Sequence, residues 1–277
     1  VTGFGQDGPY SQRPGYDFIF QGMGGLMSIT GERDDYPGGG PQKVGIAITD
    51  VLTGMYASLA VAAALTHRER TGQGQYIDTA LLDTIVAFNA NQIVSYFASG
   101  RIPTRWGNAH PQVVPYEVFA VADGHIILAV GNDGQFKRFC KQAGCPELAE
   151  EARFATMSQR IIHRRELIPI LADAMRQRTK QEWLDALEAA TVPCGPINNM
   201  KEVFEDAQVK HRGLRVDMPH SLGGTAPVVA SPMRMSETPV EYRLAPPTLG
   251  QHNEEVMKGL LGKSDAELQA LRSAGVI

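Results

Sequence analysis

The feature that most constrains the fold is an apolar run, residues 44–48, that leads through Thr49 to Asp50 and then into a long stretch of small residues. The β-branched residues of the run favour a strand, and the small residues that follow, to about His67, favour a closely packed helix. Asp50 is therefore expected at a strand–helix junction, where the first helical N–H groups lack partners within the helix. Two interpretations are open: a helix cap, or a chemical group held in a field that stabilises anions.

Composition narrows the class of protein. The chain has 277 residues, of which 43% are hydrophobic, enough for a substantial core in one large domain or two smaller ones. A net charge of −4 gives no footprint for nucleic acid or an anionic membrane surface. The most apolar run, residues 55–65, is shorter than the roughly 20 residues of a membrane helix, so we predict a buried helix. The three cysteines form no CxxC pair, and we expect a cytoplasmic protein without a metal site.

The rest of the chain shows alternating helix and strand patterns. Helices are predicted at residues 18–27 with a glycine break, 51–67, 81–97, 135–143, 159–177, 179–190, 253–261 and 264–274. A short strand is predicted at residues 76–80, and a hairpin joins residues 113–120 to 125–130. Thr179 and Ser264 are predicted N-caps. From Pro193 onward the chain is predicted to be extended, before the last two helices. Residues 113–195 are interpreted as a small α+β domain.

Several motifs identify a resemblance by their order and spacing, although each is weak alone. They are Thr2-Gly3-Phe4-Gly5-Gln6-Asp7-Gly8-Pro9-Tyr10, Gly15-Tyr16-Asp17, Gly25-Leu26-Met27, Asp50 with its helix, Arg70-Thr71-Gly72-Gln73-Gly74-Gln75, Pro193-Cys194-Gly195-Pro196, Ser231-Pro232 and Leu249-Gly250-Gln251-His252. With them the chain resembles, essentially end to end, the class III CoA-transferase family. That family includes formyl-CoA transferase, carnitine CoA-transferase and the α-methylacyl-CoA racemases.

The resemblance implies an α/β fold in which a small α+β domain is inserted in a large Rossmann-like domain, and two subunits interlocked as a homodimer. Residues 1–112 would be the incomplete N-terminal part of the large domain, 113–195 the small domain, and 196–277 the return to the large domain. Chains of the family begin well before the residue matched to Val1. We therefore expect a preceding segment with the first βα units and many CoA contacts, which makes this chain a piece of a longer protein.

Asp50 matches the nucleophilic aspartate of the family. The resemblance implies that its carboxylate attacks an acyl-CoA thioester, passes through an acyl-aspartyl anhydride and an aspartyl-CoA thioester, and delivers CoA to an acceptor acid. Nearby helix N–H groups would stabilise the carboxylate and the developing oxyanions. Asp83 also precedes an apolar helix, but it is interpreted as a cap, and Asp78 as a structural residue.

The segment Pro14, Gly15, Tyr16 and Asp17 falls where the family binds the thiol end of CoA. Racemases of the family have a histidine at the position of Tyr16, which shuttles the α-proton together with the aspartate. Tyrosine, with a pKa near 10, is a poor base at neutral pH, so Tyr16 favours CoA transfer over racemisation. The competing interpretation of Tyr16 is core packing.

The segment 107–112 falls where formyl-CoA transferase has a glycine-rich loop over its intermediate. Here it is not glycine-rich but contains His110 and Gln112, which are candidate contacts to an acceptor carboxylate. A solvent-exposed loop histidine is the alternative. Cys194 is interpreted as buried, and His252 as structural or at an interface.

Together these observations predict a CoA-transferase that uses Asp50 and acts on an acyl-CoA and a small carboxylic acid. Segments 107–110 and 131–136 resemble the branch that handles succinyl-CoA and other dicarboxylates. CoA thioester enters as substrate, and no permanently bound cofactor, nucleic acid or membrane is expected. Two alternatives stay open: an α-methylacyl-CoA racemase or epimerase, and an inactive CoA-binding fragment.

Overall fold

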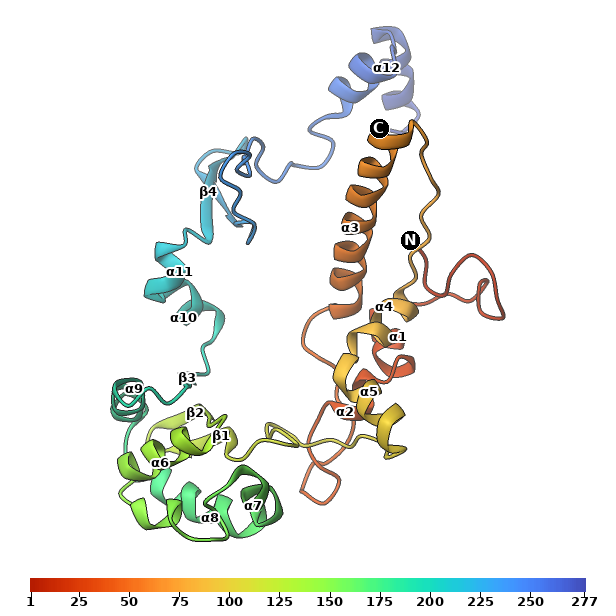
Figure 1. The fold of residues 1–277 in the computed structure, drawn as a ribbon. Coiled ribbons are helices and arrows are strands. Elements are labelled where there is room, and N and C mark those ends of the chain that lie inside the picture. The colour runs from red at the N-terminus through yellow and green to blue at the C-terminus, as the bar shows by residue number, and fades with distance from the viewer. The chain divides into compact units, whose positions relative to one another are not determined.

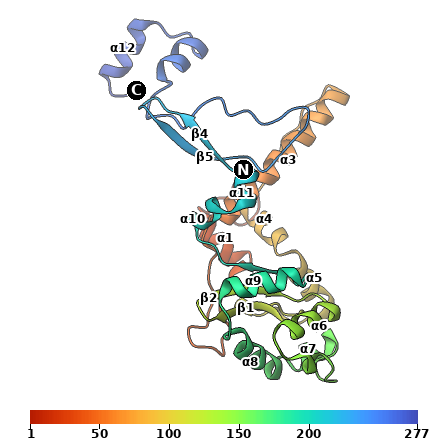
Figure 2. The ribbon, with the colours of Figure 1, turned by 90° about the vertical axis from the view of Figure 1, so that its left-hand side faces the viewer.

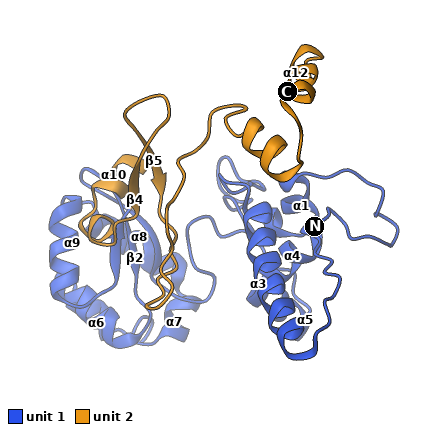
Figure 3. Ribbon diagram, turned by 90° about the horizontal axis from the view of Figure 1, so that it is seen from above, with its two compact units in different colours: residues 1–196 blue, residues 197–277 orange.

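A computed structural model describes all residues, 1–277, as two compact units, residues 1–196 and residues 197–277 (Figures 1 and 3). The first part of unit 1 is helical: α1 Asp17–Met23, α2 Leu26–Ile29, α3 Ile48–Thr71, α4 Leu81–Phe88 and α5 Ala90–Ser99. The second part of unit 1 contains β1 Tyr116–Val121, β2 Gly124–Ala129, α6 Asp133–Gln142, η1 Pro146–Ala149, α7 Met157–Ile162, α8 Arg164–Met175, α9 Lys180–Ala189 and β3 Cys194–Pro196.

The apolar run before Asp50 is not a strand, so that prediction is wrong. Residues 44–47 form a loop, and α3 begins at Ile48 with Ala47 as its N-cap. The loop is held by hydrogen bonds to a side chain instead of a sheet: the Val44 N–H donates to the buried Gln21 Oε1 at 3.0 Å, and Gln21 Nε2 donates to the Ile46 carbonyl at 3.4 Å. No other strand pairs with this run, and its β-branched residues alone do not make it a strand.

Helix α3 is longer than predicted and is not buried within the chain. It ends where Gly72 adopts φ +77°, a left-handed conformation that glycine adopts without steric cost. Only Thr49 and Thr53 are buried along it, and Figures 1 and 2 show it projecting away from α1, α4 and α5. By length and composition alone α3 could cross a membrane, a test that core helices of soluble proteins also pass.

Two further predicted helices are broken in the structure. The helix expected at residues 81–97 is interrupted at Asn89, whose buried Nδ2 donates to the Gly24 carbonyl at 2.6 Å. The helix expected at residues 159–177 is interrupted at His163, between α7 and α8. The only parallel strand pairing is an isolated bridge between Thr2 and Ala80, directly before α4. The predicted short strand at residues 76–80 is reduced to this bridge.

The hairpin prediction is confirmed. Strands β1 and β2 pair antiparallel around Ala122 and Asp123, and β3 adds to β2 as the third strand. Helices α6 to α9 pack around this sheet (Figure 1). Nineteen buried residues form its core, among them Phe139 and Trp183, all drawn from residues 114–192. The capping box predicted at Thr179 is present, with Glu182 as its reciprocal partner.

Unit 2 contains more regular structure than the sequence indicated. Its elements are α10 Met200–Glu205, α11 Ala207–His211, β4 Arg215–Pro219, β5 Thr225–Val229, η2 Glu255–Leu260 and α12 Asp265–Ser273. Strands β4 and β5 form an antiparallel hairpin. The predicted Ser264 cap of α12 is confirmed, and η2 is a short π-helix where an α-helix was expected.

Candidate functional site

Asp50 lies in the first turn of α3, two residues inside the helix and not at the N-cap. Its side chain is exposed and makes no hydrogen bond or ion pair with the rest of the chain. A carboxylate at this position is stabilised by the positive end of the helix dipole, although it makes no capping hydrogen bond. The cap interpretation of Asp50 is therefore wrong, and the carboxylate is free to meet a substrate.

The cap of α3 comes from Asp17, in the first turn of α1. Asp17 Oδ1 accepts the Thr49 N–H at 2.8 Å, and Oδ2 accepts from Gln21 Nε2 at 2.7 Å. Since Gln21 is itself hydrogen-bonded to the loop before α3, one partly buried network fixes the start of the helix that carries Asp50. Asp17, predicted to contact CoA, thus has both carboxylate oxygens occupied in holding α3.

The other predicted CoA-contact residues lie next to this network. Gly15 faces the Phe20 ring, and a Cβ there would come within 2.3 Å of it, so only glycine fits. Tyr16 precedes α1 with its side chain 82% exposed, and the core-packing interpretation of Tyr16 is wrong. Pro14 is exposed as well. This segment presents an accessible phenol one residue from the group that positions α3.

His110 and Gln112 line a second place, a polar cavity of about 380 Å³ between α5 and the segment 101–112. The Gln112 N–H donates to His110 Nδ1 at 3.0 Å. Burial, followed by the nearby positive charge of Arg164, lowers the pKa of His110 below its usual value. The imidazole is therefore neutral at pH 7, and because Nδ1 accepts, its proton is on Nε2.

The structure brings the predicted residues together in two sets. Asp17 joins the turn of Asp50, and His110 joins Gln112, but Asp50 is not among the residues that line the His110 cavity. Of the other residues weighed, Asp78 accepts the Gln6 N–H at 3.3 Å, a structural contact. Cys194 is half-buried, with its thiol pKa raised by burial.

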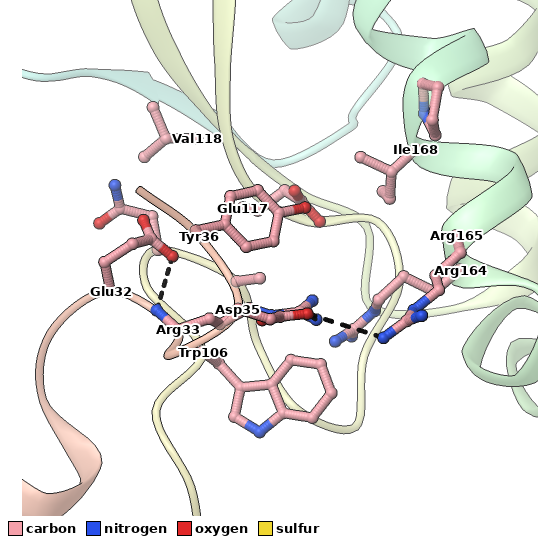
Figure 4. A pocket seen from close by; sticks show the side chains of 13 residues that line it. Glu32, Arg33, Asp35, Tyr36, Trp106, Glu117, Val118, Arg164, Arg165 and Ile168 are labelled. Atoms are coloured by element: carbon pink, nitrogen blue, oxygen red, sulfur yellow. Dashed lines mark hydrogen bonds and ion pairs between the residues drawn. The ribbon is translucent and has the colours of Figure 1, made fainter. Parts of the chain in front are cut away.

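A larger cavity of unit 1, about 490 Å³, was not predicted from the sequence (Figure 4). Arg33 forms two hydrogen bonds with Asp35, at 2.8 and 2.6 Å, which raise the pKa of Arg33 and lower that of Asp35. The Arg164 guanidinium stacks on Trp106, 4.6 Å from the ring centre. Burial raises the pKa of Glu117, which lines the same cavity. These residues come from four separate segments, so no local pattern could have grouped them.

Arg164 connects the two cavities. It lines the larger one, and its Nη2 donates to the carbonyl of His110 and, at 3.4 Å, to that of Val113. Its Nε and Nη1 are buried without a partner, and burial lowers the pKa of Arg164. Because the guanidinium is fixed by Trp106 and by two carbonyls, it holds the backbone of the segment that carries His110.

No group of three or more His, Cys, Asp or Glu side chains is arranged to hold a metal ion. The N-terminus of α3 offers the free carboxylate of Asp50, and the cavity around His110 offers hydrogen-bond donors. A free carboxylate can act as a nucleophile toward a thioester. Donors in a polar cavity can bind an anion.

Comparison with known proteins agrees with this chemistry. The sequence model of CoA-transferase family III matches residues 1–253. Succinate–glutarate CoA-transferase of Agrobacterium fabrum is 48% identical over 260 residues, which are 94% of this chain and 64% of the relative. Human succinyl-CoA:glutarate CoA-transferase is 39% identical over 277 residues, 100% of this chain and 62% of the relative.

A similar solved structure is that of a CaiB/BaiF family protein from Brucella suis. It is 43% identical with a TM-score of 0.81, and the match covers 94% of this chain and 66% of the other. The chain thus spans slightly less than two thirds of the length of the curated relatives described above.

Proposed function

The chain belongs to CoA-transferase family III, and on that premise we propose that the protein moves coenzyme A from an acyl-CoA to a small dicarboxylic acid. The two curated relatives are named for succinate or succinyl-CoA and for glutarate, both dicarboxylic. The observation that carries the proposal is the Asp50 carboxylate, exposed and unpaired at the N-terminus of a helix whose start is fixed by Asp17.

In the proposed mechanism Asp50 is the covalent carrier. Its carboxylate attacks the thioester carbonyl of the donor, forms an acyl-aspartyl anhydride and expels CoA thiolate. The thiolate attacks the aspartyl carbonyl, which releases the donor acid and leaves an aspartyl-CoA thioester. The acceptor carboxylate then attacks this thioester, and the returning thiolate attacks the acyl carbonyl of the new anhydride, which gives the product thioester and regenerates Asp50. The N–H groups of the first turn of α3 favour the negative charges that develop.

The segment Pro14, Gly15, Tyr16 and Asp17 is proposed to meet the thiol end of CoA. The exposed Tyr16 supports this role, and its poor basicity at neutral pH argues against proton abstraction by a racemase. His110 and Gln112 are proposed to contact the acceptor acid, because a neutral His110 offers the Nε2 proton to a carboxylate.

The whole protein is proposed to have a Rossmann-like large domain, with residues 113–195 as the inserted small domain, and to form an interlocked homodimer in the cytoplasm. The parallel bridge of Thr2 and Ala80 directly before α4 supports a βα arrangement. Support for a subunit interface comes from α3, where Val51, Met55 and Leu59 repeat every four residues on one face and are all more than half exposed.

The test is the Asp50→Asn variant of the full-length protein, assayed with succinyl-CoA and glutarate. Loss of the nucleophile is expected to lower kcat by about a thousandfold or more, with unchanged secondary structure. Asp83→Asn, an exposed aspartate in the first turn of α4, is the matched control and is expected to keep full activity. Half or more of the wild-type rate in Asp50→Asn would contradict the proposal. Exchange of the α-proton in deuterated water without transfer would indicate a racemase.

A further inference from the structure

The two cavities described above differ in the charge of the side chains that line them. The larger is lined by three arginines and three acidic residues: Glu32, Arg33, Asp35, Glu117, Arg164 and Arg165. The smaller, around His110, is lined by no acidic residue and by one arginine, Arg101. Its remaining polar lining is neutral and comes largely from α5, including Asn91 and Ser95. Acidic and basic side chains are thus equal in number around the larger cavity, whereas the smaller cavity has one arginine and no carboxylate.

Arg101 is unpaired in the structure. Its backbone N–H donates to Ser99 Oγ at 3.2 Å, just after Gly100 ends α5 with φ +69°. No hydrogen bond or ion pair engages its guanidinium, in contrast to Arg33 and Arg165, which both meet Asp35. Five N–H donors at the cavity are thus available to a ligand. A guanidinium with free donors matches a carboxylate better than any other side chain does.

The donors around Arg101 also suit an anion. His110 has its proton on Nε2, because Nδ1 accepts the Gln112 N–H. The side chains of Asn91 and Gln112 make no hydrogen bond within the chain, so their amides are available too. A volume of about 380 Å³ lies within the range of small-molecule sites. The cavity thus has room for a carboxylic acid of a few carbons and contains no carboxylate that would repel it.

We infer that this cavity binds a carboxylate of the dicarboxylic substrate, and that Arg101 selects dicarboxylic over monocarboxylic acids. The inference rests on the proposed function for the identity of the acid, and it adds a residue and a cause of specificity. The guanidinium and amide donors of this site are exposed and His110 is half-buried, so a bound ligand must itself exclude water from them. An analogue that excludes water but leaves the donors unpaired then binds less well. A monocarboxylic acid of equal length would place a methyl group where the second carboxylate belongs.

The experiment compares glutarate with valerate, which has five carbons and one carboxylate. Binding is measured by calorimetry on the full-length protein carrying Asp50→Asn, and transfer is measured on the protein without that change. We expect wild-type residues at the cavity to favour glutarate, and Arg101→Gln to lower the glutarate-to-valerate ratio of both affinity and kcat/KM about tenfold. Arg101→Lys is expected to restore part of the ratio, because the charge is kept and the planar donor geometry is lost.

Arg165→Gln is the matched control. Arg165 is an exposed arginine of the larger cavity, 3.7 Å from Asp35, and its removal is expected to leave the ratio unchanged. Equal ratios in wild type and Arg101→Gln, or a fall only in Arg165→Gln, would overturn the inference. If the wild type transfers CoA to neither acid, the proposed function fails. The calorimetric ratio still decides whether Arg101 selects the second carboxylate.

Discussion

The two parts of unit 1, the helices α1 to α5 and residues 114–192, differ in how many of their apolar side chains are buried. Residues 114–192 contribute nineteen buried residues to one core, around a three-stranded sheet. The helices α1 to α5 share a buried core of three, Phe20, Leu26 and Ile85, although α3 alone has 24 residues. Residues 114–192 bury their apolar side chains within the chain, whereas α1 to α5 leave much of their apolar surface exposed and available for contact with other protein surface.

This difference matters for function because Asp50 lies in α3, in the part of unit 1 that has the smaller core. Its helix is held at one end by the Asp17 network, and the exposed apolar stripe of Val51, Met55 and Leu59 begins at the residue after Asp50. A nucleophile on such a helix is positioned both by its cap and by whatever covers the stripe. We assign the covering surface to the proposed second subunit, so the geometry of Asp50 and the subunit contact are expected to be linked.

Core truncation gives the largest expected contrast. In the chain of residues 1–277, Phe139→Ala is expected to lower the free energy of unfolding by about 3–5 kcal/mol, because Phe139 is fully buried and leaves a cavity. Leu59→Ala on α3 is expected to change it by under about 0.5 kcal/mol, because this side chain is 67% exposed. Urea unfolding measures both. Similar losses in the two variants would show that the two parts do not differ as described.

A charge on the apolar stripe tests what covers it. In the full-length protein Leu59→Glu is expected to raise the dimer dissociation constant about a hundredfold, because an unpaired carboxylate is costly to bury. Ile162→Glu, on the exposed side of α7, is the control. Light scattering over a dilution series measures the dimer fraction. An unchanged dissociation constant in Leu59→Glu would contradict the proposal that α3 lies in the subunit interface.

The cap of α3 gives a smaller effect. Asp17→Asn replaces one of two acceptor oxygens with a donor that faces either the Thr49 N–H or the Gln21 amide. We expect a loss of about 1 kcal/mol in unfolding free energy and a reduced kcat, because α3 is less firmly placed. Asp83→Asn is again the matched comparison, since its side chain makes no hydrogen bond. Unchanged stability in Asp17→Asn would show that the network does not hold the helix.

The smallest expected effect is the pH dependence of stability that comes from His110. This residue joins the two parts of unit 1, because its backbone N–H donates to the Tyr116 carbonyl at 2.8 Å. Its folded pKa is lowered, while the unfolded chain has the ordinary value near 6.5. As pH falls below about 7, the unfolded state takes up a proton first, so stability falls until the folded pKa is passed. His110→Gln is expected to remove this part of the slope between pH 7 and 5. An identical slope in wild type and variant would contradict it.

What the sequence predicted well was local. The caps at Thr179 and Ser264 depend on a partner three residues away, and the β1–β2 hairpin depends on one turn. The Asn199 capping box of α10 has the same local signal, with Glu202 three residues further on. Segment 44–48 is not the predicted strand, because the Val44 N–H and the Ile46 carbonyl are bonded to Gln21, more than twenty residues away.

The candidate site was predictable only in part, for the same reason. The resemblance indicated Asp50, but nothing in the sequence indicated that Asp17 would provide its cap across more than thirty residues. The charge contrast between the two cavities depends on segments that are brought together by folding, such as residues 33, 117 and 164. The absence of Asp and Glu side chains around Arg101 is a property of the folded cavity, and residues near Arg101 in the sequence do not reveal it.

Direct capture of the covalent carrier tests the central claim most closely. The full-length protein is incubated with succinyl-CoA, treated with hydroxylamine or borohydride, digested, and its peptides are weighed by mass spectrometry. The proposed mechanism predicts a hydroxamate or a reduced alcohol on the peptide that contains Asp50, and no such product in Asp50→Asn. A modification on another residue, or transfer with no trapped product on any peptide, would contradict the assignment of Asp50 as the nucleophile.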